Sequence, residues 1–325
     1  MKNRLLLTIG DPNSIAPEVA SKSLAKLPEE VISRFIIIGE PASFDQYFSS
    51  PVFSACTFET IEPEDCSLEF RFSPGTPSAA SGGMSFCFLR RAVELIKANH
   101  ARHLVTAPVS KSLIVRSGIP GTGGFRGHTD YLAESFGAGE YSMMFYSRDM
   151  KVILVTIHHP LKDVPALITP AAIETALKNA VDFFRLIDQE KYNIAVCGLN
   201  PHAGEDGHLG CEDLSVIAPA VEKYKKLGYD IHGPLPADSV FHHARLGEYD
   251  MVVAMYHDQG LAPFKMLHFM DGVNVTLGLP FLRTSPDHGT AFDIAGKGIA
   301  DESSMDNAIE LLIKADTLWE NKARR

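Results

Sequence analysis

Short apolar runs alternate with amphipathic stretches along most of this 325-residue chain. The runs are almost continuously apolar, as in residues 4–10 and 34–40, instead of alternating between apolar and polar residues. Such strands are typical of a mostly parallel sheet that helices cover on both faces. Further runs of this kind occupy residues 103–110, 141–147, 151–157, 193–200, 250–256 and 273–280. The chain is therefore predicted to be an α/β protein.

Helical spacing of apolar residues marks several of the stretches between these runs. We expect helices over residues 15–27, the second half of 81–100, 170–187, 211–228, and a last one that starts near Ser303. No repeat, low-complexity tract or clean linker interrupts the pattern, so the sequence only weakly determines the domain boundaries.

Composition excludes several classes of protein. Thirty Lys and Arg against forty Asp and Glu give a net charge of −10, whereas a dedicated nucleic-acid surface needs a strong cationic footprint. No apolar stretch reaches the roughly 18 residues of a membrane span. The first apolar run is shorter than the roughly 7–15 residues of a signal-peptide core. Five cysteines without a C-x-x-C pair are best explained as free thiols, so we expect a cytoplasmic protein without disulfides.

Histidines follow three of the predicted strands. His158 and His159 come directly after the run 151–157, His202 follows 193–200, and His257 follows 250–256. The carboxyl ends of parallel strands form the edge of an α/β sheet where ligands bind. Imidazoles gathered there suit zinc and other divalent first-row metals. We favour a metal site over a chance scatter of histidines, but spacing alone does not choose between His158 and His159.

A glycine-rich stretch, GTGGFRGHTDYLAE, covers residues 121–134. Its glycines would let backbone amides approach an anion, and Thr129 or Asp130 would cap a following helix. A flexible loop with a capped helix is an equally good interpretation. Because Arg126 stands where a dinucleotide fingerprint needs its third glycine, a standard Rossmann site is not supported. No P-loop and no G-x-S-x-G motif occur elsewhere.

Isolated polar residues among apolar ones form a third group: Lys265, Asn274 and Arg283. Lys and Arg are good ligands for phosphate or carboxylate, and Arg binds two oxygens at once. Surface charge is the alternative, although the closeness of these residues to His257 in the sequence favours a site. Asp238 and Asp258 are candidates for orienting an imidazole or binding a substrate amine, or for capping a loop.

Several long motifs resemble a known family: GHTDYLAE, HHPLKDVP, GLNPHAGEDGHLGCED, YHDQGLAPFK and GVNVTLGLPFLRTSPDHGTAFDIAGKG. They resemble the 4-hydroxythreonine-4-phosphate dehydrogenases of pyridoxal phosphate synthesis, and the resemblance runs from the first strand to about residue 305. It implies an isocitrate/isopropylmalate dehydrogenase-like fold of two α/β/α domains with an active-site cleft between them. The first domain would comprise residues 1–125 plus 275–325, and the second, metal-binding and dimerisation domain residues 126–274.

The resemblance also implies a set of site residues. Metal ligands carry over to His158, His202 and His257, drawn from both subunits of a homodimer; His158 is preferred because the family's ligand lies two residues before the motif's proline. Substrate contacts and catalytic roles carry over to the residues already singled out. The implied substrate contacts are His128, Thr129, Lys265, Asn274 and Arg283, with Asp238 and Asp258 as further candidates, and Lys265 and His257 as the catalytic pair.

The implied reaction is the NAD- or NADP-dependent oxidation of 4-phosphohydroxy-L-threonine, assisted by Zn, Mg, Mn or Co. The resulting 3-keto acid would lose carbon dioxide to give 3-amino-2-oxopropyl phosphate, in pyridoxine 5'-phosphate biosynthesis. One alternative is a paralogous dehydrogenase for 4-phospho-D-threonate or 4-phospho-D-erythronate. Another is a non-catalytic protein that binds metal and phosphate.

The first loop departs from the family's pattern, which reads close to GDPAGIGPE. Here the loop is GDPNSIAPE, with Ser14 and Ala16 in place of two glycines. If that turn needs a positive φ or a close approach to a ligand, affinity or specificity would differ.

Overall fold

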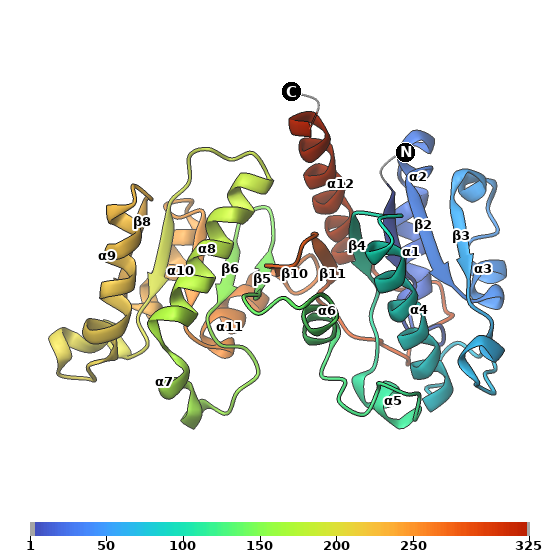
Figure 1. Cartoon of the computed structure of the whole chain (residues 1–325), viewed down its shortest axis with the longest axis horizontal. Helices are drawn as coiled ribbons and strands as arrows, with labels where there is room; N and C mark the ends of the chain where they lie inside the picture. Colours follow the sequence, from blue (N-terminus) through green and yellow to red (C-terminus); the bar gives the residue numbers. More distant parts are fainter. Residues whose placement is uncertain (1–3, 324–325) are drawn as a thin grey trace. The chain divides into compact units, whose positions relative to one another are not determined.

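The computed structural model describes residues 4–323, which form two compact units (Figure 1). One unit comprises the described residues up to Gly139 together with Leu279–Asp316, and the other comprises Glu140–Gly278 and the described residues from Thr317. His128 and Thr129 therefore belong to the first unit, although the expected second domain begins at residue 126. None of the helices in residues 4–323 is long and apolar enough to cross a membrane.

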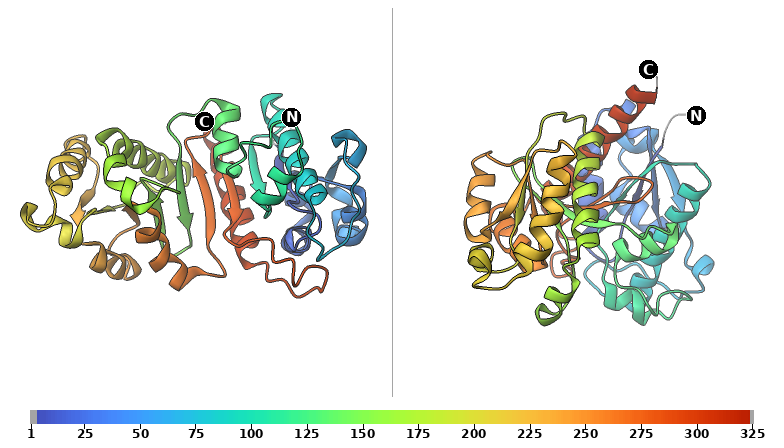
Figure 2. Two further views of the ribbon diagram at one scale, coloured as in Figure 1. Left: turned by 90° about the horizontal axis from the view of Figure 1, so that it is seen from below. Right: turned by 60° about the vertical axis from the view of Figure 1, so that its left-hand side comes forward.

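The first unit contains a parallel sheet with the strand order β3-β2-β1-β4-β11. Its strands are β1 (Leu5–Thr8), β2 (Phe35–Gly39), β3 (Thr57–Thr60), β4 (His103–Thr106) and β11 (Arg283–Pro286). Its helices are α1 (Ala16–Ala25), α2 (Glu29–Ile32), α3 (Pro41–Tyr47), α4 (Ala79–Lys97), α5 (Lys111–Arg116), α6 (His128–Phe136) and most of α12 (Ser303–Ala323). α4 covers one face of this sheet, and α1 and α12 cover the other (Figures 1 and 2).

The second unit contains a sheet with the strand order β10-β5-β6-β9-β7-β8. Its strands are β5 (Ser142–Tyr146), β6 (Lys151–Leu154), β7 (Ile194–Cys197), β8 (Ile231–Leu235), β9 (Met251–Ala254) and β10 (Val273–Leu277). Its helices are α7 (Val164–Leu167), α8 (Pro170–Leu186), α9 (Ala218–Lys226), α10 (Ala237–Arg245) and α11 (His257–His268). β5 pairs antiparallel with β6 and β10, and the other pairs are parallel. Both units thus confirm the predicted α/β class with a mostly parallel sheet.

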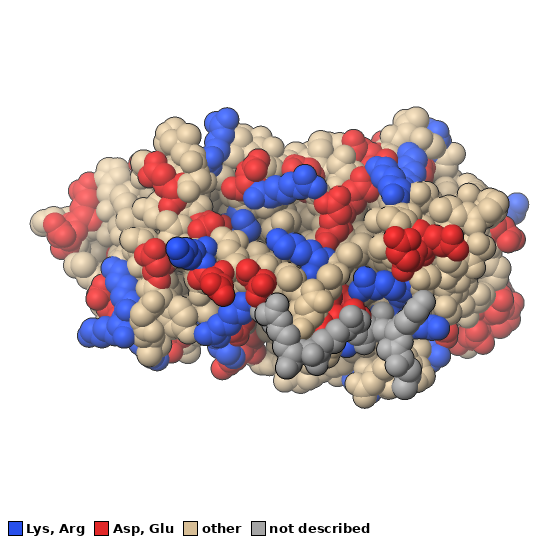
Figure 3. All heavy atoms as spheres, turned by 90° about the horizontal axis from the view of Figure 1, so that it is seen from above, with Lys and Arg blue, Asp and Glu red and all other residues tan. Residues whose placement is uncertain are grey.

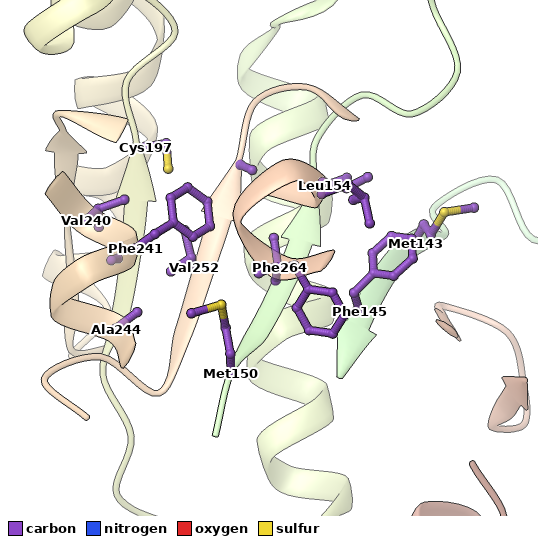
Figure 4. Close-up of a cluster of buried hydrophobic side chains, with 14 residues drawn as sticks. Met143, Phe145, Met150, Leu154, Cys197, Val240, Phe241, Ala244, Val252 and Phe264 are labelled. Atoms are coloured by element: carbon purple, nitrogen blue, oxygen red, sulfur yellow. The ribbon is translucent and has the colours of Figure 1, made fainter. Parts of the chain in front are cut away.

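One core cluster of the second unit lies between its sheet and α10 and α11, on the face opposite α8 (Figures 2 and 4). Phe264 of α11 packs against Phe145 of β5, with ring centroids 5.8 Å apart. Each fully buried side chain of this size stabilises the fold by about 1.5–3 kcal/mol. Gly260 lets α11 approach the sheet, because a Cβ there would lie 2.8 Å from Leu154 Cδ2.

Two sequence-based predictions of local structure are wrong. α4 begins at Ala79, not in the second half of residues 81–100, because Ser78 caps its first turn. Its glycines are helical: a Cβ on Gly82 would lie 2.5 Å from the backbone of Leu113, so α5 packs too closely for a side chain. The stretch after His257, where no helix was expected, is α11, which continues through Pro263.

The expectation that all cysteines are free is also wrong. Cys66 and Cys87 form a disulfide, whereas Cys56, Cys197 and Cys211 are free. The short turn Pro63–Cys66 packs against α4 and so brings Cys66 beside Cys87. Spacing did not reveal this pair because the two residues are 21 positions apart and lie on different elements.

Candidate active-site residues in the two units

The histidine-bearing segments of the second unit follow three adjacent strands. β6, β9 and β7 are parallel neighbours in that order, so their carboxyl ends meet at one edge of the sheet. His158, His257 and His202 follow these strands in turn. The strand order explains why residues far apart in the sequence reach one edge.

His158 and His257 lie together. Their ring centroids are 5.5 Å apart, and His257 is the first residue of α11. His257 Nδ1 lies 2.7 Å from Asp258 Oδ1, so the Asp258 carboxylate orients this imidazole. Nε2 of His257 is then the nitrogen suited to coordination.

His202 lies in a backbone turn of unusual hand. The segment Pro201–Gly207 contains five consecutive residues, His202 to Asp206, with positive φ. The side chain of His202 is exposed, and its Nδ1 is hydrogen-bonded to Glu205 Oε1, which raises its pKa. Among residues 4–323, no three His, Cys, Asp or Glu side chains are grouped so that they could hold a metal. The structure therefore groups His158 with His257 but does not add His202 to that pair.

The donor chemistry of these residues nevertheless fits a divalent metal. A metal-ligating imidazole usually makes a hydrogen bond from its second nitrogen to a carboxylate or carbonyl. His202 and His257 both have Nδ1 against a carboxylate, which leaves Nε2 as the ligand atom. The predicted Asp238 is exposed at the start of α10, and its negative charge also raises the pKa of His202.

The other predicted residues of the second unit lie on regular elements. Lys265 is half-buried on α11, with Nζ 5.9 Å from the centroid of the Phe269 ring. Asn274 is half-buried on β10, opposite Phe145 of β5. Asn274 thus lies on the predicted strand 273–280, whereas Lys265 lies on a helix that was not expected.

Gln259, which sequence analysis missed, joins two of the histidine segments. Its Oε1 accepts a hydrogen bond from the Met255 N–H at 2.7 Å, and its Nε2 donates to the Gly198 carbonyl at 2.8 Å. It thereby links the turn before His257 to the segment that leads to His202. Its position directly after Asp258 in YHDQGLAPFK is the only signal that the sequence offered.

The first unit contains a buried cation. Arg283 begins β11, is 3% exposed, and donates from Nε and Nη2 to Thr106 Oγ1 at 3.0 and 2.7 Å. Burial lowers its pKa to about 9. An anionic ligand beside this guanidinium would offset the cost of desolvating its charge. Thr106, at the carboxyl end of β4, is a second residue that sequence analysis missed.

His128 lies near this cation and is kept neutral. Its pKa is lowered well below the usual value, first by burial and then by the positive charges of Arg283 and Lys111. Lys111 also approaches the glycine-rich stretch, since a Cβ on Gly127 would lie 3.2 Å from Lys111 Cε. The structure thus brings the predicted His128 and Arg283 into one electrostatic neighbourhood and adds Lys111 to it.

The predicted capping of the helix after the glycine-rich stretch is wrong. α6 begins at His128, and Gly127, with φ +150°, is its N-cap without a side-chain cap. Thr129 and Asp130 lie inside the first turn, and Thr129 is buried. The glycine is needed because a residue with a Cβ is strained at this φ.

The first loop tolerates its two replaced glycines. Neither Ser14 nor Ala16 has a positive φ; the residue of this loop that does is Gly10, at +71°. Ser14 Oγ donates to the Asp11 carbonyl at 2.7 Å and accepts from the Ala16 N–H at 3.0 Å. The turn is therefore closed by a serine hydroxyl without a left-handed backbone at position 14. Asp11, whose carbonyl accepts from this hydroxyl, has a buried carboxyl group, and burial raises its pKa to about 6.

Several known proteins are similar to this chain over most of its length. The family model for "Pyridoxal phosphate biosynthetic protein PdxA" matches residues 25–312. A 4-hydroxythreonine-4-phosphate dehydrogenase of Sulfurihydrogenibium sp. (strain YO3AOP1) is 41% identical, covering 95% of this chain and 97% of that protein. The structure of a putative 4-hydroxythreonine-4-phosphate dehydrogenase from Salmonella typhimurium superposes with a TM-score of 0.81 at 35% identity, covering 97% and 100%. A terephthalate 1,2-cis-dihydrodiol dehydrogenase from Burkholderia xenovorans LB400 superposes with a TM-score of 0.68 at 26% identity, covering 96% and 98%.

Proposed function

The chain belongs to the PdxA family of pyridoxal phosphate biosynthetic proteins, and from this premise we propose that it is a 4-hydroxythreonine-4-phosphate dehydrogenase. Its reaction is the oxidation of 4-phosphohydroxy-L-threonine at the secondary hydroxyl, with transfer of hydride to NAD or NADP. Loss of carbon dioxide from the 3-keto acid then gives 3-amino-2-oxopropyl phosphate. This chemistry places the protein in pyridoxine 5'-phosphate synthesis, and we assign it to the cytoplasm.

The observation that carries this proposal is the set of histidines at the carboxyl ends of β6, β9 and β7. His202 and His257 have a carboxylate on Nδ1, and the His158 ring lies beside that of His257. We propose that His158, His202 and His257 hold a divalent ion (Zn, Mg, Mn or Co), with ligands from both subunits of a homodimer. The ion would act as a Lewis acid that lowers the pKa of the substrate hydroxyl.

Residues of the first unit bind the anionic part of the substrate. Arg283 has a buried guanidinium, and burial removes the water that would stabilise its charge. An anion next to it stabilises that charge instead. His128 is neutral, so one ring nitrogen donates a hydrogen bond without adding to the positive charge of Arg283 and Lys111. Thr129, in the first turn of α6, contributes its hydroxyl to the same contact.

Residues of the second unit bind and protonate the reacting part of the substrate. Lys265 pairs with the substrate carboxylate and, after carbon dioxide leaves, gives its proton to the carbon that held it. Asn274 donates a hydrogen bond from its amide. Asp258 holds the His257 ring, and Asp238 accepts from the substrate amine. A bound nicotinamide would supply the hydride acceptor.

Exposed apolar side chains support a dimer. Met266, Phe269 and Met270 follow Lys265 at the end of α11 and are 79%, 66% and 55% exposed. Apolar side chains gathered at one surface are typical of protein interfaces, and we propose that a second copy of the chain covers them.

On the face shown in Figure 3, Lys and Arg lie among Asp and Glu, and do not form one cationic patch. Because the net charge of the chain is −10, we propose neither a nucleic-acid nor a membrane partner.

The alternative substrates remain because the fold hosts other dehydrogenases, as the terephthalate dihydrodiol enzyme shows. A side-by-side assay of reduced nicotinamide formation with 4-phosphohydroxy-L-threonine, 4-phospho-D-threonate and 4-phospho-D-erythronate distinguishes them. We expect the L-threonine derivative to be turned over fastest with either NAD or NADP. Faster turnover of a D-acid phosphate would favour the paralogous activity, and no reduction with any of them would leave a non-catalytic binding protein.

A further inference from the structure

The turn that carries His202 has a backbone that L-amino acids rarely adopt. From His202 to Asp206 the φ angles are 51°, 54°, 84°, 43° and 54°, and only Gly204 among these residues lacks a side chain. A left-handed run of residues with a Cβ is sterically unfavourable. Such a conformation persists only where surrounding contacts impose it.

One fully buried carboxylate, Asp213 in the π-helical turn Asp213–Ile217, contacts the segment that leads into this run. Asp213 Oδ1 accepts the Leu199 N–H at 2.7 Å. Asp213 Oδ2 accepts the backbone and side-chain N–H groups of Asn200 at 3.2 and 2.9 Å. The negative charge is thus solvated by amides of the segment that leads into the left-handed turn.

The backbone closes tightly around this carboxylate. A Cβ on Gly198 would lie 2.6 Å from Asp213 Oδ1 and 2.7 Å from Ala203 Cα. A Cβ on Gly204 would lie 3.2 Å from Asp213 Oδ2. Glycine at both positions therefore lets the chain fold over Asp213, with one of them before His202 and the other after it.

We propose that Asp213 is a positioning residue for His202: its carboxylate holds the left-handed turn in the conformation that presents this imidazole to the metal. The proposal rests on the metal site of the proposed function. The hydrogen bonds of Asp213 go to Leu199 and Asn200, so it acts through the backbone of residues 198–204. Gln259 fixes the same segment from the other side, at the Gly198 carbonyl.

The variant Asp213→Asn tests this role. It keeps the size of the side chain but turns an N–H₂ group toward amide donors, so the turn is released. We expect the affinity for Co²⁺, measured by calorimetric titration of the full chain, to fall by about 10–100-fold. Turnover lost at limiting Co²⁺ should return at saturating Co²⁺, which a general loss of folding would not permit.

A matched control separates positioning from general stability. Asp250 also holds a loop, since its Oδ2 accepts the Asn193 N–H at 3.0 Å and its Oδ1 accepts from Gln189 Nε2 at 2.9 Å. It lies just before β9, at the opposite end of the strand from His257. Asp250→Asn should therefore leave the Co²⁺ affinity unchanged.

A rescue variant sharpens the test. Ala203 has φ +54°, so Ala203→Gly relieves strain in the turn. We expect Ala203→Gly to raise the Co²⁺ affinity of the Asp213→Asn variant several-fold. If Asp213→Asn does not fold, Asn200→Ala replaces it. This variant removes the side-chain amide that donates to both Asp213 and Glu212, and it should also weaken Co²⁺ binding.

Wild-type affinity in a folded Asp213→Asn protein would overturn the positioning role and leave the proposed function intact. Wild-type affinity in Asn200→Ala, where the first variant does not fold, would also overturn it. Failure of the wild-type protein to bind Co²⁺ at all would instead remove the metal site, and with it both proposals.

Discussion

Two histidines of the first unit and three of the second lie in opposite environments. In the first unit, burial and neighbouring positive charges lower the pKa of His103 to about 3 and that of His128 well below its usual value. In the second, His158 and His202 are exposed and His257 is partly exposed, and carboxylates face Nδ1 of the last two. A buried neutral imidazole serves as a hydrogen-bond donor or acceptor, whereas an exposed imidazole oriented by a carboxylate is suited to a metal. On these grounds we propose anion binding for the first unit and metal binding for the second.

Removing one of the histidines proposed to bind the metal should have the largest effect. We expect His257→Ala to lower turnover of 4-phosphohydroxy-L-threonine by more than about 100-fold, because it removes a ligand and not merely its orienting partner. His232 is the matched control, since it is exposed in the same unit and its Nε2 lies 2.8 Å from Asp230 Oδ1. Turnover is measured as reduced nicotinamide formed. Equal turnover of His257→Ala and His232→Ala would contradict the role of His257 as a metal ligand.

Removing the buried cation of the first unit should have an intermediate effect. Arg283→Met keeps the length of the side chain but loses the charged donors, so we expect KM to rise by about 10–100-fold. The turnover at saturating substrate should change less than KM. Arg91→Met, which removes an arginine paired with Glu59 and Glu94 on α4, is the control and should leave KM unchanged. A normal KM in Arg283→Met would remove anion binding from the first unit.

The smallest effect concerns stability at low pH. The pKa of His103 is lowered from 6.5 to about 3 in the folded protein, so its contribution to stability is complete above about pH 6.5 and is lost as the pH falls towards 3. In that window the unfolded chain binds a proton that the folded one does not. His103→Asn keeps an acceptor for the Leu282 N–H. In this variant the unfolding free energy should fall less steeply with decreasing pH, by about 1.4 kcal/mol per pH unit. Denaturant titrations of both proteins between pH 6.5 and 4 measure this slope, and equal slopes would contradict the buried neutral state.

Much of the fold could be predicted because it depends on local patterns. Continuous apolar runs located strands of both units, and the first-turn Pro17 agreed with α1. The strand order β6-β9-β7 was not accessible, because it depends on which helices cross over the sheet. That order is what places His158 and His257 side by side.

The errors arose where tertiary contacts override local preference. The glycines of α4 and α11 discouraged a helix prediction, yet they are there because neighbouring elements approach too closely for a Cβ. The left-handed turn at His202 has no local signal, since most of its residues normally avoid that conformation. Asp213, which sets it, follows His202 by eleven positions and carries no motif of its own.

The most direct test of the central claim is metal removal from the whole enzyme. Chain treated with a chelator and then freed of it should form no reduced nicotinamide from 4-phosphohydroxy-L-threonine, with a loss of more than about 100-fold. Re-addition of Zn²⁺ or Co²⁺ should restore turnover in wild type but not in His202→Ala. Full turnover by metal-free protein, or full restoration in His202→Ala, would contradict a metal site built on the histidines of the second unit.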